Sequence, residues 1–278
     1  VTIIGESKNS TQIVKRFEGG SLLRYKNAPY WGLSNVMLQG ASESSGLGNL
    51  LHIEGSSYGR ASDSRLLNAN GFCIRIEQGS GITGAYFNVL DGLHTYNGRI
   101  GNIYCGLESS ETKIIGGEHS ASKGFGWVIE GGNGHNGIGA SFEGSNVGGV
   151  SVGTSLIASE VNLFGCRFEG AGKSLYGVQV ANVNSILGVF GCHMTSCVVA
   201  DVFDPDHAMV TFIQPNRSSS PSSISGLKVH GDNHYLGALN VLNQSGVWGI
   251  RGPSTTRVES LTNSIELRPN SGLVSHGI

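Results

Sequence analysis

Three glutamates in the middle of the chain recur at nearly constant spacing. Glu143 lies 25 residues after Glu118, and Glu169 lies 26 residues after Glu143. Arg167 and His193 stand beside them in the same short phrases. Carboxylates that share one wall of a repeating structure are the groups that a glycosidase needs as general acid and base.

The phrase around these glutamates is itself repeated. Its copies begin 25, 23, 26 and 26 residues apart, and they read LDGLHT (from Leu90), IGGEHS (from Ile115), IGASFE (from Ile138), FGCRFE (from Phe164) and FGCHMT (from Phe190). Further short β-branched segments lie between and before the copies, namely LLHIEG (50–55), CIRIEQG (73–79), WVIEGG (127–132), VSVG (150–153) and VQVAN (178–182). No segment sustains the apolar period of a helix. A repeat of this length, built from strands alone, predicts an all-β parallel β-helix with about 25 residues per coil.

Alternation along each strand assigns the faces of the predicted coils. We expect the second, fourth and sixth positions of the phrase to point outward, which places Glu118, Glu143 and Glu169 on one exposed wall. The first, third and fifth positions are expected to point inward. They form the columns Leu90/Ile115/Ile138/Phe164/Phe190, Gly92/Gly117/Ala140/Cys166/Cys192 and His94/His119/Phe142/Phe168/Met194.

Strand spacings then suggest catalytic roles for the three glutamates. Glu118 and Glu143, one coil and two residues apart, would be separated by roughly 8 Å, as in an inverting glycosidase pair. Glu143 and Glu169 would stack at about 5 Å, so that mutual repulsion raises the pKa of one of them and makes it the acid. Glu118 would be the base that activates water, although the two roles are interchangeable. The alternative is that the glutamates only solvate the solenoid and that Arg167 pairs with a neighbouring carboxylate.

A second group of charged residues is expected on the intervening strands. It consists of His52, Glu54, Arg75, Glu77 and Glu130, all outward by the same alternation. A base and a cation together suit a polysaccharide lyase, but a charge ladder at a subunit interface is the preferred interpretation.

Substrate binding is predicted for residues beside both groups. Sugars stack on aromatic rings, and the candidate rings near turns or strand edges include Tyr96 and Trp127. With the charged neighbours, the predicted substrate-binding residues are Arg167, His193, Tyr96, Trp127, Arg75 and Glu77.

Composition narrows the range of partners. The net charge is −2 and charged residues make up 14% of the chain. The chain therefore lacks the excess of positive charge that binds the phosphates of nucleic acid, and we expect no nucleic-acid partner. No apolar run approaches the length that spans a bilayer, and we expect no membrane insertion. Five cysteines without short paired spacings indicate folding in a reducing compartment. No CxxC pair or HExxH is present, and GGNGHNGIG (131–139) reads as a glycine turn, so we expect no metal and no cofactor.

The N-terminal phrasing carries a family resemblance. VTIIGESKNSTQIV, followed by WGLSNVMLQG, resembles the pectate-lyase-like right-handed β-helix superfamily and is most similar to the central domains of bacteriophage tailspikes. The resemblance covers about residues 1–215 and rests mostly on structural positions. In that family a glycine-rich strand and a capping helix usually precede the IIGES coil, and neither is present in this sequence. We therefore expect a fragment, a processed product, or a short spike whose N-terminal part is another polypeptide.

The domain organisation follows from where the coil phrasing stops. We predict a parallel β-helix over 1–215, a linker or edge loop over 216–226, and a β-rich capping or trimerisation module over 227–278.

The resemblance implies a virion tail protein that is folded in the host cytoplasm, forms a homotrimer, contacts other tail proteins and attaches to the bacterial surface. Its expected function is to bind and hydrolyse a capsule or O-antigen polysaccharide. Whether it is an enzyme stays open, because a non-catalytic structural or receptor-binding spike and a polysaccharide lyase share the fold.

Overall fold

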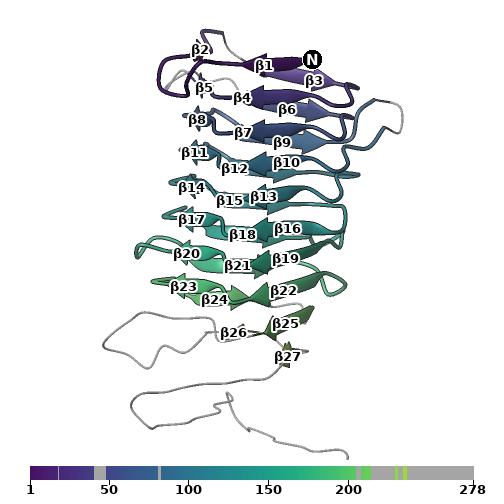
Figure 1. Cartoon of the computed structure of the whole chain (residues 1–278). Coiled ribbons are helices and arrows are strands. Elements are labelled where there is room, and N and C mark those ends of the chain that lie inside the picture. Colours follow the sequence, from purple (N-terminus) through teal and green to yellow (C-terminus); the bar gives the residue numbers. More distant parts are fainter. Residues whose placement is uncertain are drawn as a thin grey trace, which may run out of the picture. The chain divides into compact units, whose positions relative to one another are not determined.

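The computed structural model of the chain is a parallel β-solenoid of about seven turns with about 26 residues per turn, as Figure 1 shows. No helix of the described residues is long and apolar enough to cross a membrane. All the described residues belong to the first of two compact units, Val1–Asn240. They comprise 1–17, 19–40, 48–80, 83–204, 208–213, 229–230 and 234–236.

From β1 to β24, each coil contributes one strand to each of three parallel sheets, in the chain order A, B, C (Figure 1). Sheet A stacks β1 (Thr2–Ile4), β4 (Gly32–Ser34), β7 (Arg60–Ser62), β10 (Val89–Asp91), β13 (Lys113–Ile115), β16 (His135–Ile138), β19 (Glu160–Phe164), β22 (Ile186–Phe190), β25 (Met209–Ile213) and β27 (His234–Leu236). Sheet B stacks β2 (Gln12–Val14), β5 (Met37–Gln39), β8 (Arg65–Leu67), β11 (His94–Tyr96), β14 (Glu118–Ser120), β17 (Ser141–Glu143), β20 (Arg167–Glu169) and β23 (His193–Thr195). Sheet C stacks β3 (Leu23–Lys26), β6 (Leu51–Glu54), β9 (Phe72–Glu77), β12 (Gly101–Cys105), β15 (Phe125–Ile129), β18 (Gly148–Val152), β21 (Tyr176–Val180), β24 (Ala200–Phe203) and β26 (Val229–His230).

The all-β solenoid predicted from the repeat is therefore confirmed, including the intervening strands, which form sheet C. Two short strands of the predicted C-terminal module, β26 and β27, are described, and they pair parallel with β24 and β25. The predicted linker 216–226 and the remainder of 227–278 lie outside the described residues.

A residue in a left-handed conformation turns the chain from sheet A into sheet B, and in one coil a second, Gly117, follows it. In seven coils the φ of the first of these residues lies between 46° and 62°, a region that glycine and asparagine enter most readily. The residue before this corner faces outward and the residue after it faces inward, so the alternation shifts by one place. The corner residues are Asn35, Asp63, Gly92, Gly116, Gly139, Gly165 and Gly191.

Because of this corner, the predicted interior column of Ile115, Ile138, Phe164 and Phe190 lies on the outside of the solenoid. Ile138 and Phe164 are 41% and 40% exposed, because they precede the corner and point to solvent. The buried residues of these strands stand one place earlier, as with Leu163 and Val189. The first copy of the phrase was also misaligned by one residue, since Ile115 pairs with Asp91 rather than with Leu90.

The other two columns are interior in the later coils, as predicted. Phe142 and Phe168 are in register and 1% exposed, and their ring centroids lie 5.4 Å apart. Cys166 and Cys192 fill the smaller column beside them. In the first copy, however, the inward residues are Leu93 and Thr95, and His94 faces outward.

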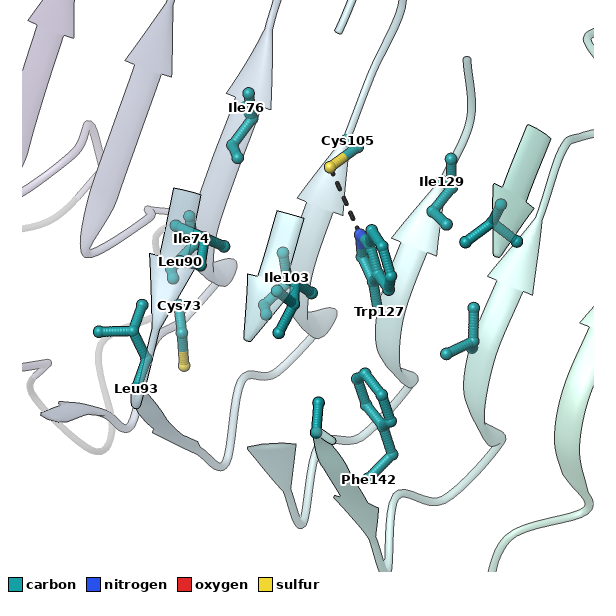
Figure 2. Packing of buried hydrophobic residues seen from close by; sticks show 14 of the residues in the cluster. Cys73, Ile74, Ile76, Leu90, Leu93, Ile103, Cys105, Trp127, Ile129 and Phe142 are labelled. Atoms are coloured by element: carbon teal, nitrogen blue, oxygen red, sulfur yellow. Dashed lines mark hydrogen bonds between the residues drawn. The ribbon is translucent and has the colours of Figure 1, made fainter. Parts of the chain in front are cut away.

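The cysteines are free, and four of the five are buried among apolar side chains. Cys105 Sγ accepts a hydrogen bond of 3.4 Å from the indole of Trp127, as Figure 2 shows. Burial raises the pKa of Cys73 to about 12 and that of Cys105 to about 11. These thiols therefore act as small apolar fillers of the core.

The corner conformation can be tested at Gly139, where an added Cβ would meet no atom within 4 Å. Any cost of Gly139→Ala is therefore conformational, and we expect the free energy of unfolding to fall by about 1 kcal/mol. Gly139→Asn is the control and should cost less, because Asn35 occupies the same corner. Urea unfolding followed by circular dichroism measures both, and an alanine variant as stable as the parent would contradict the corner's role.

Two histidines are buried inside the coils with one ring nitrogen unpartnered. His119 Nδ1 lies 2.9 Å from the hydroxyl of Thr95, and Nε2 has no hydrogen-bond partner among the described residues. His135 Nε2 lies 3.0 Å from the carbonyl oxygen of Gly131, and its Nδ1 is unpartnered within the same part of the chain. Burial, with a smaller contribution from His94, lowers the pKa of His119 to about 3, and burial lowers the pKa of His135 to about 4.

Acid should therefore destabilise the solenoid. In the unfolded chain these histidines bind protons below pH about 6.5, whereas in the folded chain they stay neutral down to pH about 3 for His119 and about 4 for His135. Between these limits the free energy of unfolding falls by about 1.4 kcal/mol per pH unit for each histidine. Replacing Thr95 by Val and His119 by Phe together extends the phenylalanine column and should remove one histidine's share of the slope. Unfolding free energies measured between pH 4 and 8 test this, and parallel curves for parent and variant would contradict it.

Candidate functional site

The outer side of sheet B carries the predicted catalytic residues in two neighbouring columns, which we call the sheet-B face. One column holds outward residues that begin each strand: His94, Glu118, Ser141, Arg167 and His193. The other holds those that end it: Tyr96, Ser120, Glu143, Glu169 and Thr195. The glutamates of three consecutive coils thus lie on one wall, as the spacing predicts.

Glu118 is the most exposed of the three carboxylates. Its side chain is 45% exposed and lies 3.8 Å from Nδ1 of His94 in the preceding coil. The hydroxyl of Ser120 donates a hydrogen bond of 2.9 Å to it. No arginine or lysine pairs with Glu118 among the described residues.

Glu143 and Glu169 are stacked in register, and Arg167 lies beside both. Its guanidinium is 3.6 Å from Glu143 and forms an ion pair and a hydrogen bond with Glu169. The hydroxyl of Ser141 donates a hydrogen bond of 2.6 Å to Glu143. The positive charge of Arg167 offsets the repulsion between Glu143 and Glu169 from which a raised pKa was predicted. The alternative prediction, that Arg167 pairs with a neighbouring carboxylate, is confirmed.

The pairing register of β14 and β17 determines how far apart the backbone positions of Glu118 and Glu143 lie. Ser120 pairs with Glu143, and Glu118 stands two residues earlier on the same strand. Strands about 4.8 Å apart and a rise of about 3.3 Å per residue put the two backbone positions about 8 Å apart. The backbone positions are thus about as far apart as the carboxyl groups of an inverting glycosidase, which are about 6.5–9.5 Å apart.

Tyr96 borders this pair on the sheet-B face, and His193 lies two strands beyond Glu143, on the far side of Arg167. The Tyr96 ring is 43% exposed, in register with Ser120. His193 is in register with Arg167, but its Nε2 is buried and has no hydrogen-bond partner among the described residues.

Trp127 is not on the surface, and its assignment to substrate binding was wrong. Its side chain is fully buried, inside the coils between Cys105 and Phe142 (Figure 2). The alternation that turns Glu130 outward places Trp127 and Ile129 inward.

The second predicted constellation is assembled on the outer side of sheet C, as the alternation implies. His52 pairs in register with Arg75, and Glu54 with Glu77. Glu77 lies 2.8 Å from Nε2 of His52 and 2.7 Å from Arg75. Arg24 forms an ion pair with Glu54, and Lys26 lies 3.6 Å from it.

Sequence reasoning missed Tyr104, which completes this sheet-C cluster. Its hydroxyl donates a hydrogen bond of 2.6 Å to Glu130, and Arg75 stacks 4.9 Å from its ring centroid. The outward alternation of GNIYC (101–105) was the available signal.

Pairing dominates the electrostatics of the cluster. Burial pushes the pKa of Glu77 upward, but hydrogen bonds from His52 and Arg75 and their charges outweigh it, and the pKa falls to about 2. Burial first, and then the bond to Glu130, raises the pKa of Tyr104. The cluster therefore holds its charged groups in internal pairs rather than presenting a free base or cation.

Exposure separates the two groups. The glutamate side chains of the sheet-B face are 45%, 30% and 36% exposed, whereas those of Glu54 and Glu77 are 9% and 24% exposed. The sheet-B face is accordingly the better candidate site for a large substrate. In the described part of the chain, no group of three or more His, Cys, Asp or Glu residues is arranged to hold a metal ion.

The role of Glu77 can be tested by replacing it with glutamine. Glu77→Gln leaves Arg75 and His52 without their carboxylate and should lower the free energy of unfolding by about 1–3 kcal/mol. Any polysaccharide cleavage measured below the unfolding temperature should be unchanged. Loss of cleavage in a variant that is still folded would instead assign the chemistry to the sheet-C cluster.

Comparisons with known proteins support the fold. The solved structure described as Geobacillus virus E2 ORF18 superposes with a TM-score of 0.57 at 12% identity, over 84% of this chain and 48% of that chain. This chain thus spans about half the length of the phage protein that it matches. At this identity the likeness shows a shared fold and nothing finer.

A second solved structure, the catalytic unit of a thermostable GH87 α-1,3-glucanase from Streptomyces thermodiastaticus strain HF3-3, matches at 12% identity over 84% of this chain and 55% of that chain. Its TM-score of 0.29 is too low to carry an argument. No protein-family model matches the sequence, and the search of curated proteins finds no match.

Proposed function

We propose that this chain is a phage tailspike-type protein that binds a bacterial surface polysaccharide along the sheet-B face and hydrolyses it there. The observation that carries the proposal is the solvent-facing pair Glu118 and Glu143, whose backbone positions the solenoid register sets about 8 Å apart. A wall of stacked coils offers an extended surface, which suits a polymer better than a small molecule.

The surroundings of the two carboxylates suggest their roles. Glu143, with Arg167 3.6 Å away, is assigned the role of the base that takes a proton from the attacking water. Glu118, with no arginine or lysine partner among the described residues, would donate its proton to the glycosidic oxygen as the bond to the anomeric carbon breaks. Water attacking from the opposite side of the sugar inverts the configuration. This exchanges the roles expected from the sequence.

The proposal also includes a place in a phage tail and assembly as a homotrimer. The structural likeness to a phage protein is compatible with a place in a virion tail, and the N-terminal phrasing resembles tailspike domains. A parallel homotrimer would bring three solenoids around one axis in closed symmetry. Attachment at the bacterial surface follows from polysaccharide binding.

Cleavage tests the proposal directly. Glu118→Gln and Glu143→Gln should each reduce hydrolysis of a susceptible capsule or O-antigen by at least about a hundredfold, because the amide can neither donate nor accept the proton. Glu160→Gln is a control at an outward glutamate of β19 in sheet A. The measurement is mass analysis and reducing-end release from a panel of purified bacterial polysaccharides.

The products separate the candidate functions. Reducing ends without ultraviolet absorbance indicate a hydrolase, absorbing unsaturated products indicate a lyase, and binding without fragments indicates a non-catalytic adhesin. Full activity in both glutamine variants would remove Glu118 and Glu143 from the mechanism. Light scattering of the full chain should give the mass of three chains, and a monomer would remove the trimer from the proposal.

A further inference from the structure

One column on the outer side of sheet A is apolar over four consecutive coils. It consists of the residues that end β13, β16, β19 and β22, and we call it the sheet-A column: Ile115, Ile138, Phe164 and Phe190. Consecutive members are paired in register. With strands about 4.8 Å apart, the column is about 14 Å long.

The side chains of the column form one continuous surface. Ile138 and Phe164 are exposed, and Phe190 is partly exposed. The two rings are stacked, with centroids 4.7 Å apart and an interplanar angle of 10°. A Cβ added at Gly188 would meet the Phe190 ring at 2.5 Å, so the ring lies over this glycine and extends the apolar surface toward the exposed Ile186. Contiguous apolar surface marks interaction sites, whereas apolar side chains scattered singly do not.

The column differs from the other outward columns of the three sheets. In the described part of the chain, no other column of outward strand residues has large apolar side chains in four consecutive coils. The column also contains no charge, and it ends at Asp91, the register partner of Ile115, which pairs with Arg60. The sheet-B face, by contrast, carries the carboxylates of three consecutive coils.

A second copy of this chain is the occupant that such a column fits. When solenoids run parallel around one rotation axis, a column beside the axis meets the same residues of the other copies at the same height. Carboxylates in that position would repel their own copies, as like charges do in neighbouring strands, whereas isoleucine and phenylalanine gain by burial. The sheet-A column meets this requirement, and the glutamates of the sheet-B face do not.

We propose that parallel copies of this chain pack on the sheet-A column, each member against the same residue of the neighbouring copies. The inference rests on the homotrimer of the proposed function and adds the surface that forms it. The corner at Gly139 and the buried Ala140 separate Ile138 from β17 of the sheet-B face. The interface would therefore lie one corner away from the proposed catalytic carboxylates and leave them free for the polysaccharide.

A charge in the middle of the column tests the packing. Phe164→Glu should reduce the mass of the full chain in light scattering from three chains to one, because it brings like charges together at one height. Phe164→Lys should do the same, and mixing the two variants should restore an assembly, because glutamate then meets lysine. Phe87→Glu is the matched control and should keep the parent's mass, since Phe87 is also exposed and stacked, on Tyr58, but lies outside the column. Circular dichroism checks the fold of each variant.

Cross-linking tests whether a residue meets its own copies. Ile138→Cys is made in a Cys197→Ser background, in which the remaining native cysteines are buried. Oxidation by oxygen with a copper catalyst should give covalent dimers and leave about a third of the chains single, because three thiols around one axis form one disulfide. Gln179→Cys, an outward position of β21 in sheet C, is the control and should not cross-link.

The outcomes separate this inference from the proposed function. A trimeric parent whose mass Phe164→Glu leaves unchanged, or in which Ile138→Cys does not cross-link, would overturn the sheet-A column and leave the trimer standing. Loss of assembly in Phe87→Glu as well would overturn the column as the specific contact. A parent of two chains that cross-links through Ile138→Cys would overturn the trimer and leave the column, and a monomeric parent would overturn both. The polysaccharide cleavage assay tests hydrolysis independently of all these results.

Discussion

A left-handed residue that recurs at the corner from sheet A to sheet B constrains how the coils of the solenoid superimpose. Consecutive coils stack in register because they share this bend. Seven coils do so, with φ between 46° and 62°. Because the same backbone bend recurs, side chains at equivalent positions are brought to about 4.8 Å from one another along the axis.

That stacking explains why the solenoid is organised in columns of like or complementary residues. Inside, rings stack on rings, as with Phe142 and Phe168, and small residues stack on small ones. On the outside, charged side chains of one coil lie next to charged side chains of the next coil, as with Arg60 and Asp91. In the sheet-C cluster Glu54 stacks on Glu77 in register, and the pairing comes from diagonal and same-strand neighbours, as in Arg24–Glu54 and Arg75–Glu77.

The sheet-B face shows the same stacking among exposed side chains. Its carboxylates are oriented by short hydrogen bonds from Ser120 and Ser141 and remain exposed. This exposed pair of carboxylates on a wall of stacked coils is the feature on which the proposed polysaccharide hydrolysis rests.

Sequence alone was enough to predict the solenoid with about 25 residues per coil, against about 26 in the structure, the shared wall of Glu118, Glu143 and Glu169, and the assembly of His52, Glu54, Arg75 and Glu77. Spacing and alternation are enough for these, since each depends only on counting along stacked strands. Tertiary structure decided which way Ile138, Phe164 and His94 point, because the corner inserts a residue that does not alternate. It also decided that Arg167 lies between two glutamates and that Trp127 is buried. Partners contributed by neighbouring coils do not appear in any local pattern, so only the superposition of coils reveals them.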